Sequence, residues 1–323
     1  MTSVTSLFAP VESDLDQLVE NLKQLIGAKN PILFAAAEHL FQAGGKRMRP
    51  AIVFLVSRAI AHDGDISTRH RRLAEITEMI HTASLFHDDV VDESELRRGV
   101  ETVNYRFGNR IAIQAGDFMF AQASWYLANL DNLQVVKLLS EVIKDFAEGE
   151  IQQGLSSFDT DVSLDSYLEK SYYKTASLIA NSAKAAGVLS DVSLELQEDL
   201  YQFGRGVGLA FQVVDDILDF TGTTDSLGKP AGSDLKSGNL TAPVLFAMEE
   251  KPYLRVLIER ELTEPGDWEE AIALINNSQG IIKARALAES FSTKALQHLE
   301  TLPASPSKQA LVELTDYIIR RLY

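Results

Sequence analysis

The chain has 323 residues, of which 46% are hydrophobic and 24% charged, and it contains no cysteine. This length allows a large buried core, while the absence of cysteine excludes a disulfide framework, a thiolate metal site and a cysteine nucleophile. The formal net charge of −16 argues against nucleic-acid binding and against binding to anionic lipid over a broad surface. Anion binding is therefore expected only at local basic clusters, at residues 46–49, 69–72, 97–98 and 320–321.

The first ten residues contain no basic residue and no long apolar run, which argues against a secretory signal. The apolar segment 52–60 is too short to span a bilayer and is interrupted by Ser57 and Arg58. These features predict a cytoplasmic protein.

Helical periodicity runs through nearly the whole chain, and no series of short β-branched segments predicts a sheet. In chain order, helices are expected over 15–26, 32–43, 51–61, 71–92, 111–130, 133–153, 164–186, 194–220, 242–248, 268–275, 281–299 and 308–322. Breaks rich in Gly, Pro, Asp or Ser fall at 62–66, 154–162, 222–239 and 303–307. None of them resembles an interdomain linker, so one all-α domain over residues 1–323 is expected.

A cationic segment, Gly44-Gly45-Lys46-Arg47-Met48-Arg49-Pro50, precedes the third predicted helix. It is not a Walker loop, because Leu40 stands at the position of the first glycine and Arg47 replaces Ser or Thr. At a loop-to-helix junction, this segment is a candidate anion clamp.

The fourth predicted helix ends in Asp88-Asp89-Val90-Val91-Asp92, and the eighth contains the same pattern as Asp215-Asp216-Ile217-Leu218-Asp219. Three carboxylates beside a hydrophobic core cost free energy unless a cation neutralises them. Residues at i and i+4 share a helix face, so each cluster forms an oxygen-rich patch. Mg²⁺ fits such a patch, because it binds few carboxylates and completes its shell with phosphates. The two clusters therefore suggest two walls of one diphosphate site.

Arg97 and Arg98 follow the first cluster and allow two interpretations. They neutralise the adjacent carboxylates, or their guanidinium groups bind phosphate oxygens. The polar, glycine-rich segment 222–239 after the second cluster is either a lid or a surface connection.

Order, spacing and identity of these motifs resemble the trans-type polyprenyl diphosphate synthases across almost the whole chain. The matching segments are 44–50, 81–98, Tyr173-Lys174-Thr175, 211–219 and Gly228-Lys229-Pro230. The segment 238–243 is a further detail shared with the solanesyl diphosphate synthases of cyanobacteria and plastids. The resemblance implies a single large orthogonal helical bundle of the isoprenoid synthase type, with a central diphosphate and magnesium site.

The family condenses isopentenyl diphosphate head-to-tail, in all-trans geometry, with an allylic diphosphate, here a C10–C20 primer. The resemblance implies three Mg²⁺ ions with substrate bound, held by Asp88, Asp92 and Asp215, with Asp89, Asp216 and Asp219 in support. It assigns Arg97, Lys174 and Lys229 to the allylic diphosphate, and Lys46, Arg49, His81 and Arg98 to isopentenyl diphosphate. Thr175 and Gln212 match the residues that stabilise the carbocation. A homodimer is also implied, with at most transient membrane contact for product release.

The allylic tail is expected to run beside the fourth predicted helix towards its N-terminus, where Ser84 and Ala83 lie one turn before Asp88. The next turns offer Ile80, then Ile76 and Thr77, so no large side chain blocks the path. This predicts eight to ten isoprene units, with nine (C45) favoured by the solanesyl-like resemblance. Candidates for the floor are Phe118, Phe120, Trp125 and Phe146.

The chain departs from the family at Asn239, where many members have Lys. A shorter-chain geranylgeranyl synthase and a terpene cyclase on the same fold remain alternatives. A metal-dependent phosphohydrolase built on His87-Asp88 and a non-enzymatic regulatory subunit are weaker ones. Two intact Asp clusters and the clamp at Lys46 and Arg49 favour condensation over the last three, while a shorter-chain synthase differs only in product length.

Overall fold

The computed structural model describes residues 7–27, 29–42, 44–61, 65–222 and 231–322, and most of these residues are helical. The chain divides into two compact units. The first comprises Met1–Ile143, Leu178–Tyr201 and Leu299–Leu314; the second comprises Lys144–Ser177, Gln202–His298 and Thr315–Tyr323.

The first unit contains the N-terminal helices and a short hairpin. Its elements are η1 (Ala9–Val11), α2 (Glu12–Leu25), α3 (Pro31–Gln42), α4 (Met48–Ile60), α5 (Thr68–Val91), β1 (Leu96–Arg97), β2 (Val100–Glu101), α6 (Val103–Phe107) and α7 (Asn109–Ala128). It also takes in the first part of α8 (Leu133–Leu155), most of α10 (Ser177–Leu189), and the beginnings of α11 (Leu194–Thr221) and α18 (Pro306–Arg320).

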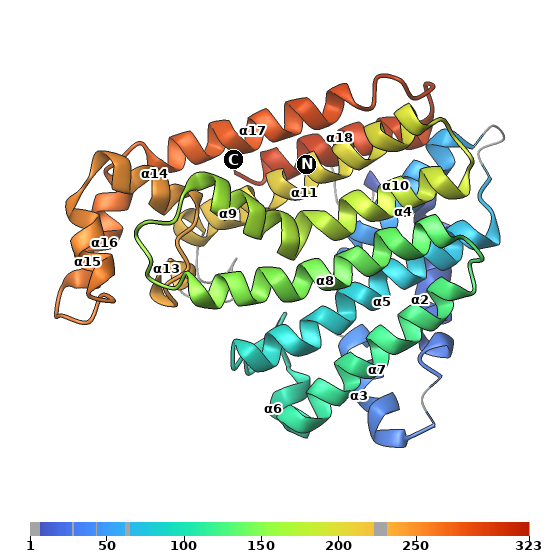
Figure 1. The fold of residues 1–323 in the computed structure, drawn as a ribbon, viewed down its shortest axis with the longest axis horizontal. Coiled ribbons are helices and arrows are strands. Elements are labelled where there is room, and N and C mark those ends of the chain that lie inside the picture. Colours follow the sequence, from blue (N-terminus) through green and yellow to red (C-terminus); the bar gives the residue numbers. More distant parts are fainter. Residues whose placement is uncertain (1–6, 28, 43, 62–64, 223–230, 323) are drawn as a thin grey trace. The chain divides into compact units, whose positions relative to one another are not determined.

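The second unit contains the remainder of α8, α11 and α18. Between them lie α9 (Leu164–Ser171), η2 (Tyr172–Ala176), α13 (Ser233–Lys236), α14 (Ala242–Glu250), α15 (Tyr253–Glu259), α16 (Asp267–Asn276) and α17 (Gly280–Gln297). Figure 1 shows α14, α15 and α16 grouped together, in agreement with the contacts among these three helices.

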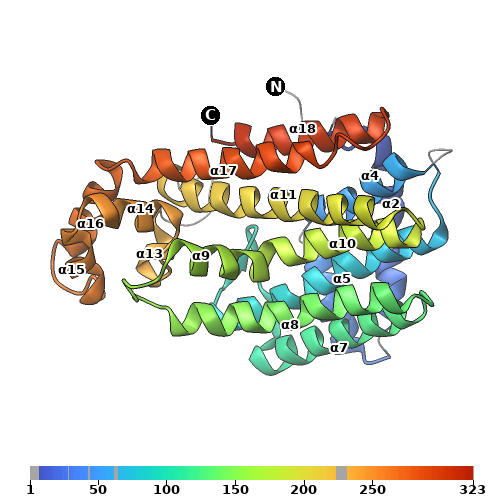
Figure 2. The same ribbon diagram turned by 45° about the horizontal axis from the view of Figure 1, so that its top comes forward.

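Helix α4 lies in the core of the first unit, because every residue from Pro50 to Ser57 is buried. A helix that is apolar on all sides requires neighbours on all sides. Helix α5 is one of these neighbours, and it also packs along α7, as Figures 1 and 2 both show. Helix α5 is therefore held between α4 and α7, and this packing fixes the position of the first Asp cluster at its C-terminal end.

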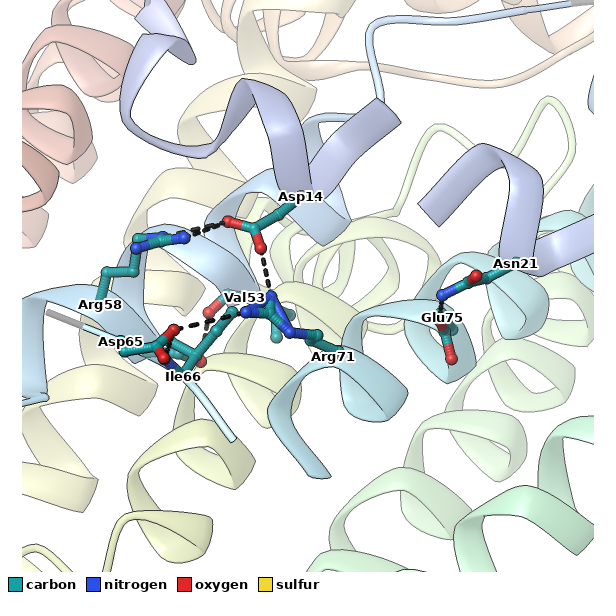
Figure 3. Close-up of polar contacts among 9 residues, drawn as sticks. Asp14, Asn21, Val53, Arg58, Asp65, Ile66, Arg71 and Glu75 are labelled. Carbon is teal, nitrogen blue, oxygen red and sulfur yellow. Dashed lines mark hydrogen bonds and ion pairs between the residues drawn. The ribbon is translucent and has the colours of Figure 1, made fainter. Parts of the chain in front are cut away.

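Charged side chains connect α2 to α4 and α5 (Figure 3). Asp14 on α2 is only 6% exposed, and it pairs with Arg58 at 2.6 Å and with Arg71. About two helical turns further along α2, the side chain of Asn21 donates a hydrogen bond of 2.6 Å to Glu75. A buried carboxylate is stable only when it is paired and hydrogen-bonded, so these contacts fix α2 on the α4–α5 pair.

A π-helical segment lies in the second unit, at residues Tyr172–Ala176. Residues 164–186 were predicted as one helix, but residues Tyr172–Ala176 form the π-helix η2 between α9 and α10. Two glycines allow the neighbouring helices to approach it. A Cβ at Gly149 of α8 would lie 2.9 Å from Lys174 Cγ, and one at Gly208 of α11 would lie 2.5 Å from Ala176 Cα. Single π turns inside helices are frequent at functional sites.

The predicted helices are otherwise confirmed, with ends that differ by a few residues, whereas several short elements were missed. The strands β1 and β2 have two residues each, and α6 and α13 are one turn long, so none of them produces a measurable periodicity. Helix α15, directly after Pro252, was also missed. The hairpin turn has positive φ at both Arg98 (+54°) and Gly99 (+77°), which fits the two-residue turns that join antiparallel strands.

No helix in the described part of the chain is both long and apolar enough to cross a membrane.

Candidate active site

The first Asp cluster lies at the C-terminal end of α5 rather than inside the helix. The helix ends at Val91, and Asp92 is its C-cap, with its N–H bonded to the carbonyl oxygen of Asp88. Asp89 is buried, Asp88 is half-buried and Asp92 is exposed. Carboxylates at a helix C-terminus are disfavoured by the helix dipole, so this end of α5 requires positive charge.

Arg97 supplies part of that charge through Asp89. Its Nε lies 2.8 Å from Asp89 Oδ1 and 3.0 Å from Oδ2, and its Nη2 lies 2.6 Å from Oδ1. Asn104 donates to the main-chain oxygen of Asp89 at 3.1 Å. Of the two interpretations of Arg97, the structure therefore shows the neutralising contact, and a contact with phosphate stays a prediction.

Arg98 is directed away from Arg97 by the hairpin turn. Its guanidinium group donates to the carbonyl oxygen of Gly44 and lies directly against Gly45. Gly45 has φ +144° and could not carry a Cβ without displacing this guanidinium group. Because of this turn, the two adjacent arginines point to different places: Arg97 contacts the first Asp cluster, and Arg98 contacts the basic loop before α4.

The basic loop and α5 form a cationic cluster. Arg49 Nη1 lies 3.0 Å from His81 Nε2. Burial, together with the charges of Arg49, Arg98 and Arg97, lowers the pKa of His81 well below its ordinary value. The imidazole is therefore neutral, and since guanidinium can only donate, Nε2 accepts and the ring proton lies on Nδ1.

Glu78, which the sequence interpretation missed, lies in the same environment. Burial raises the pKa of Glu78, while the charges of Arg49, Arg47 and Arg98 lower it. Three arginines around one carboxyl group leave excess positive charge, as a diphosphate-binding site needs. Of the four residues predicted for isopentenyl diphosphate, Arg49 and His81 are in contact and Arg98 reaches the glycines before them, while Lys46 is exposed on the same loop.

The second Asp cluster is on α11, and two of its members are buried against the protein. Asp219 is 1% exposed and accepts hydrogen bonds from Ser233 Oγ at 2.9 Å and from the N–H of Asp234 at 3.2 Å. Asp216 is 2% exposed, with Oδ2 bonded to the hydroxyl of Tyr167 and Oδ1 to Gln212 Nε2 at 2.8 Å. Both carboxylates are thus held by hydrogen bonds from other residues of this unit.

Asp215 has a more exposed side chain (37%) and forms an ion pair with Arg321, at 2.7 Å between Oδ1 and Nη2. The guanidinium group of Arg321 also lies over the ring of Phe211, 5.0 Å from its centroid. The sequence analysis noted residues 320–321 as a basic cluster, but it did not predict that Arg321 pairs with Asp215 on α11.

A directed hydrogen-bond chain joins the two residues predicted to stabilise the carbocation. Thr175 Oγ1 donates to Gln212 Oε1 at 2.7 Å, and Gln212 in turn donates to Asp216. The amide orientation of Gln212 is thus fixed from both sides. Burial raises the pKa of Asp216 to about 7, assisted by the charges of Asp234 and Asp215 and opposed by the hydrogen bonds from Tyr167 and Gln212.

Lys174 belongs to the π-helix η2. Its ammonium group lies 2.6 Å from Glu150 Oε2 and 3.1 Å from Gln153 Oε1, both on α8. Lys174, Thr175 and Gln212 all belong to the second unit, where Thr175 contacts Gln212 and Lys174 contacts α8. Lys229 lies outside the described residues.

The donor set fits a hard divalent cation that keeps some ligands from its substrate. Within the described ranges, no three His, Asp or Glu side chains form a ready-made metal-binding group. Each cluster nevertheless combines buried, hydrogen-bonded carboxylates with less buried ones, namely Asp88 and Asp92 in the first and Asp215 in the second. At Asp215, the guanidinium of Arg321 occupies the position of a cation, and phosphate oxygens would complete a metal shell.

The residues predicted to control chain length are on α5. Ile80 and Ala83 are fully buried, whereas Ser84 is half-buried and donates from Oγ to the carbonyl oxygen of His81 at 2.9 Å. Of the floor candidates, Trp125 is 59% exposed, so in this chain its ring does not line the interior. Phe118, Phe120 and Phe146 are half-buried.

Comparison with known proteins identifies the family of this chain. The model of the polyprenyl synthetase family matches residues 30–275. A prenyl transferase of Synechocystis sp. is 65% identical over 323 residues, which cover all of both chains. Solanesyl diphosphate synthase 2 of Arabidopsis thaliana, a chloroplastic protein, is 57% identical over 99% of this chain and 78% of its own length.

A solved structure of polyprenyl synthase from Caulobacter crescentus, complexed with calcium and isoprenyl diphosphate, has the same fold. It is 34% identical, has a TM-score of 0.89, and the match covers 98% of this chain and 97% of that one.

The chain belongs to the polyprenyl synthetase family. It is a prenyltransferase of isoprenoid synthesis that builds long, all-trans chains, in a family whose substrates are isopentenyl diphosphate and allylic diphosphates. The all-α fold and the enzyme class predicted from the sequence are confirmed.

Proposed function

We propose that this chain synthesises solanesyl diphosphate, the C45 product, with Mg²⁺ as its cation. The observation that carries this proposal is the 57% identity to a solanesyl diphosphate synthase along nearly the whole chain. The small, buried Ala83 one turn before the first Asp cluster supports it, because a larger side chain there would obstruct a growing tail. A geranylgeranyl synthase remains the shorter-chain alternative.

We propose that both Asp clusters act on one allylic diphosphate, with Asp88, Asp92 and Asp215 as direct metal ligands. Asp89, Asp216 and Asp219 support them, since each is buried and held by protein donors. Mg²⁺ would supply the charge that makes diphosphate a leaving group. Arg97, Lys174 and Lys229 complete the anion's surroundings.

The second substrate is assigned to the cationic cluster. Arg49, Arg98 and Lys46 bind isopentenyl diphosphate, and neutral His81 orients Arg49. The allylic C–O bond breaks, and the isopentenyl double bond attacks the resulting carbocation. The proton then released passes to the departed diphosphate, so no side-chain nucleophile is required.

Gln212 and Thr175 stabilise the carbocation without capturing it. Their hydrogen bonds to each other and to Asp216 fix the direction of the amide dipole before the charge develops. Groups oriented in advance stabilise a transient charge most effectively, because they need not reorganise during the reaction.

The decisive experiment incubates the purified chain with Mg²⁺, isopentenyl diphosphate and a C10, C15 or C20 primer, and measures the product by mass spectrometry. An all-trans C45 diphosphate is expected. A C20 product would favour the geranylgeranyl alternative, and a cyclic hydrocarbon from allylic diphosphate alone would identify a terpene cyclase. No product from the chain alone would contradict the proposal and favour a regulatory subunit.

Domain organisation, oligomeric state and compartment are also proposals. The family match crosses both compact units, which supports one catalytic domain over residues 1–323. Exposed apolar side chains on α7, including Ile113 and Trp125, support a homodimer. The proposal of a cytoplasmic location is supported only by the composition of the chain, and a plant relative is named chloroplastic. Fractionation of the source cells tests this location.

A further inference from the structure

Lys170 is a buried charged residue to which the reaction described above gives no role. It lies in the last turn of α9 and is 7% exposed, which is rare for lysine. Tyr167, Lys170 and Ser171 are the buried residues of this helix, and their i, i+3, i+4 spacing places them on one face. Tyr167 donates a hydrogen bond to Asp216, so Lys170 shares its face with a residue that contacts the second Asp cluster.

The described residues give the Lys170 ammonium group one hydrogen-bond partner, the neutral side-chain oxygen of Asn239. An ammonium group has three donors, so this contact leaves two N–H groups for another acceptor. Its charge is balanced only at a distance. Burial lowers the pKa of Lys170, whereas Asp216, Asp234 and Glu150 attract the positive charge and Lys174 repels it.

Asn239 is itself held rigidly. Its N–H donates to the carbonyl oxygen of Asp234 at 2.8 Å. The preceding Gly238 has φ +81°, and its carbonyl oxygen accepts from the N–H of Phe158 at 2.9 Å. A Cβ at Gly238 would lie 2.3 Å from Ser157 Oγ, so the backbone here is pressed against residues 157–158. Asn239 is therefore a fixed acceptor that aims the Lys170 side chain.

We propose that Lys170, aimed by Asn239, supplies positive charge beside the second Asp cluster, and that it is a positioning residue for the metal–diphosphate complex bound there. Its charge offsets that of Asp216, Asp234 and Glu150, which would otherwise oppose the approach of an anion. The inference rests on the proposed diphosphate site, and it gives Asn239 a role as the acceptor that orients Lys170.

The experiment relocates the charge. Lys170→Met keeps the length of the side chain and removes the charge, and Lys170→Met/Asn239→Lys restores a charge at the other position. Lys283→Met, on α17 in the same unit and 45% exposed, is the matched control. Binding of inorganic diphosphate with Mg²⁺ is measured by calorimetry, alongside kcat and KM for the allylic primer, and thermal melting checks folding.

Lys170→Met is expected to weaken diphosphate binding about ten- to hundredfold, the effect of losing a charge-assisted interaction, and to lower kcat more than it raises KM. The double variant is expected to recover most of the loss, and Lys283→Met to match the wild type. Unchanged binding in Lys170→Met would overturn the inference. So would a loss that Asn239→Lys fails to restore, because the role would then not be one of charge.

If Lys170→Met fails to fold, Asn239→Leu tests the same pair with the lysine retained, and is expected to weaken diphosphate binding through misdirection of the ammonium group. Wild-type binding in Asn239→Leu would contradict the inference. Failure of the wild type itself to make any prenyl product would instead contradict the proposed function, which separates the two hypotheses.

Discussion

Asp216 is buried between two hydrogen-bond donors and two like charges. The donors are Tyr167 and Gln212, while Asp234 and Asp215 repel its negative form. A carboxyl group in this environment has a pKa of about 7, compared with an ordinary value of 3.8. The ionised form of Asp216 is therefore under electrostatic strain.

This strain predicts a pH dependence of the metal-free protein. Because the folded pKa exceeds the unfolded one, the folded state binds the proton more tightly. The resulting stabilisation is complete below about pH 4 and is lost as the pH rises towards 7. The difference corresponds to about 4 kcal/mol.

Asp216→Asn cannot ionise, so its unfolding free energy in EDTA should fall less between pH 5 and pH 8 than that of the wild type. Urea titrations at both pH values measure this, with Asp161→Asn, whose side chain is 97% exposed, as the control. Parallel pH profiles for Asp216→Asn and the wild type would contradict the prediction.

Ala83 provides a second test at the scale of one residue. Its side chain is fully buried on α5, one turn before the first Asp cluster. Ala83→Phe should shorten the product by several isoprene units, because the ring would fill the path of the growing tail. Overpacking of a buried site costs about 1–3 kcal/mol, so a melting curve must accompany the product analysis. Ala286→Phe, at an exposed position of α17, is the control, and an unchanged product length in a folded Ala83→Phe variant would refute the path along α5.

At the scale of the element, the chain directly after α18 brings a positive charge, that of Arg321, to the second Asp cluster. Arg321 pairs with Asp215 and stacks on Phe211, both on α11. We predict that a divalent cation binding at Asp215 Oδ1 competes with this guanidinium group, so that the ion pair lowers the affinity of the metal-free protein for its cation.

Arg321→Met should strengthen cation binding about two- to fivefold, the range expected for a partly exposed ion pair. Electron paramagnetic resonance of free Mn²⁺ measures the binding without turnover. Arg320→Met is the matched control, since Arg320 is 71% exposed and lies 3.9 Å from Asp316. Equal affinities in both variants would show that Arg321 does not compete.

The elements also show what a sequence can predict. Long helices such as α5 and α11 were predictable, because their apolar residues recur with helical spacing. The hairpin at 96–101 was not, since its direction depends on two positive φ angles rather than on a pattern of side chains. The arginine pair was consequently treated as one group, although the turn sends Arg97 to Asp89 and Arg98 to Gly44.

At the scale of the whole molecule, the motifs identified the chemistry but not the partners of each residue. Asp216 and Gln212 were predicted from α11, and their four-residue spacing brings them together. Tyr167 and Glu150, however, reach the site from other helices, and only the tertiary structure shows these contacts. Motif residues could therefore be predicted, whereas the groups that set their charge and direction could not.

The proposed homodimer is a prediction at this scale. Ile113 (40%), Trp125 (59%) and Leu133 (68%) are exposed apolar residues of α7 and the start of α8. Sedimentation velocity should show a dimer for the wild type and a monomer for Trp125→Glu, because a charge at a buried interface is costly. Leu194→Glu, at a position 74% exposed on α11, should remain dimeric. A monomeric wild type would contradict the proposal.

The π-helix at Tyr172–Ala176 makes the site sensitive to the insertion or deletion of a single residue during evolution. One extra residue per turn is what an insertion into a regular helix leaves behind, and Lys174 and Thr175 both lie within it. Deleting a single residue there would restore an ordinary helix and rotate every preceding side chain by about 100° relative to those that follow. Tyr167 and Lys170 would then leave their partners while the composition of the site stayed nearly the same. The rotation of α9 relative to α10 therefore depends on the number of residues in the π-helix. A deletion of one codon would change it, although the types of the site residues would stay the same.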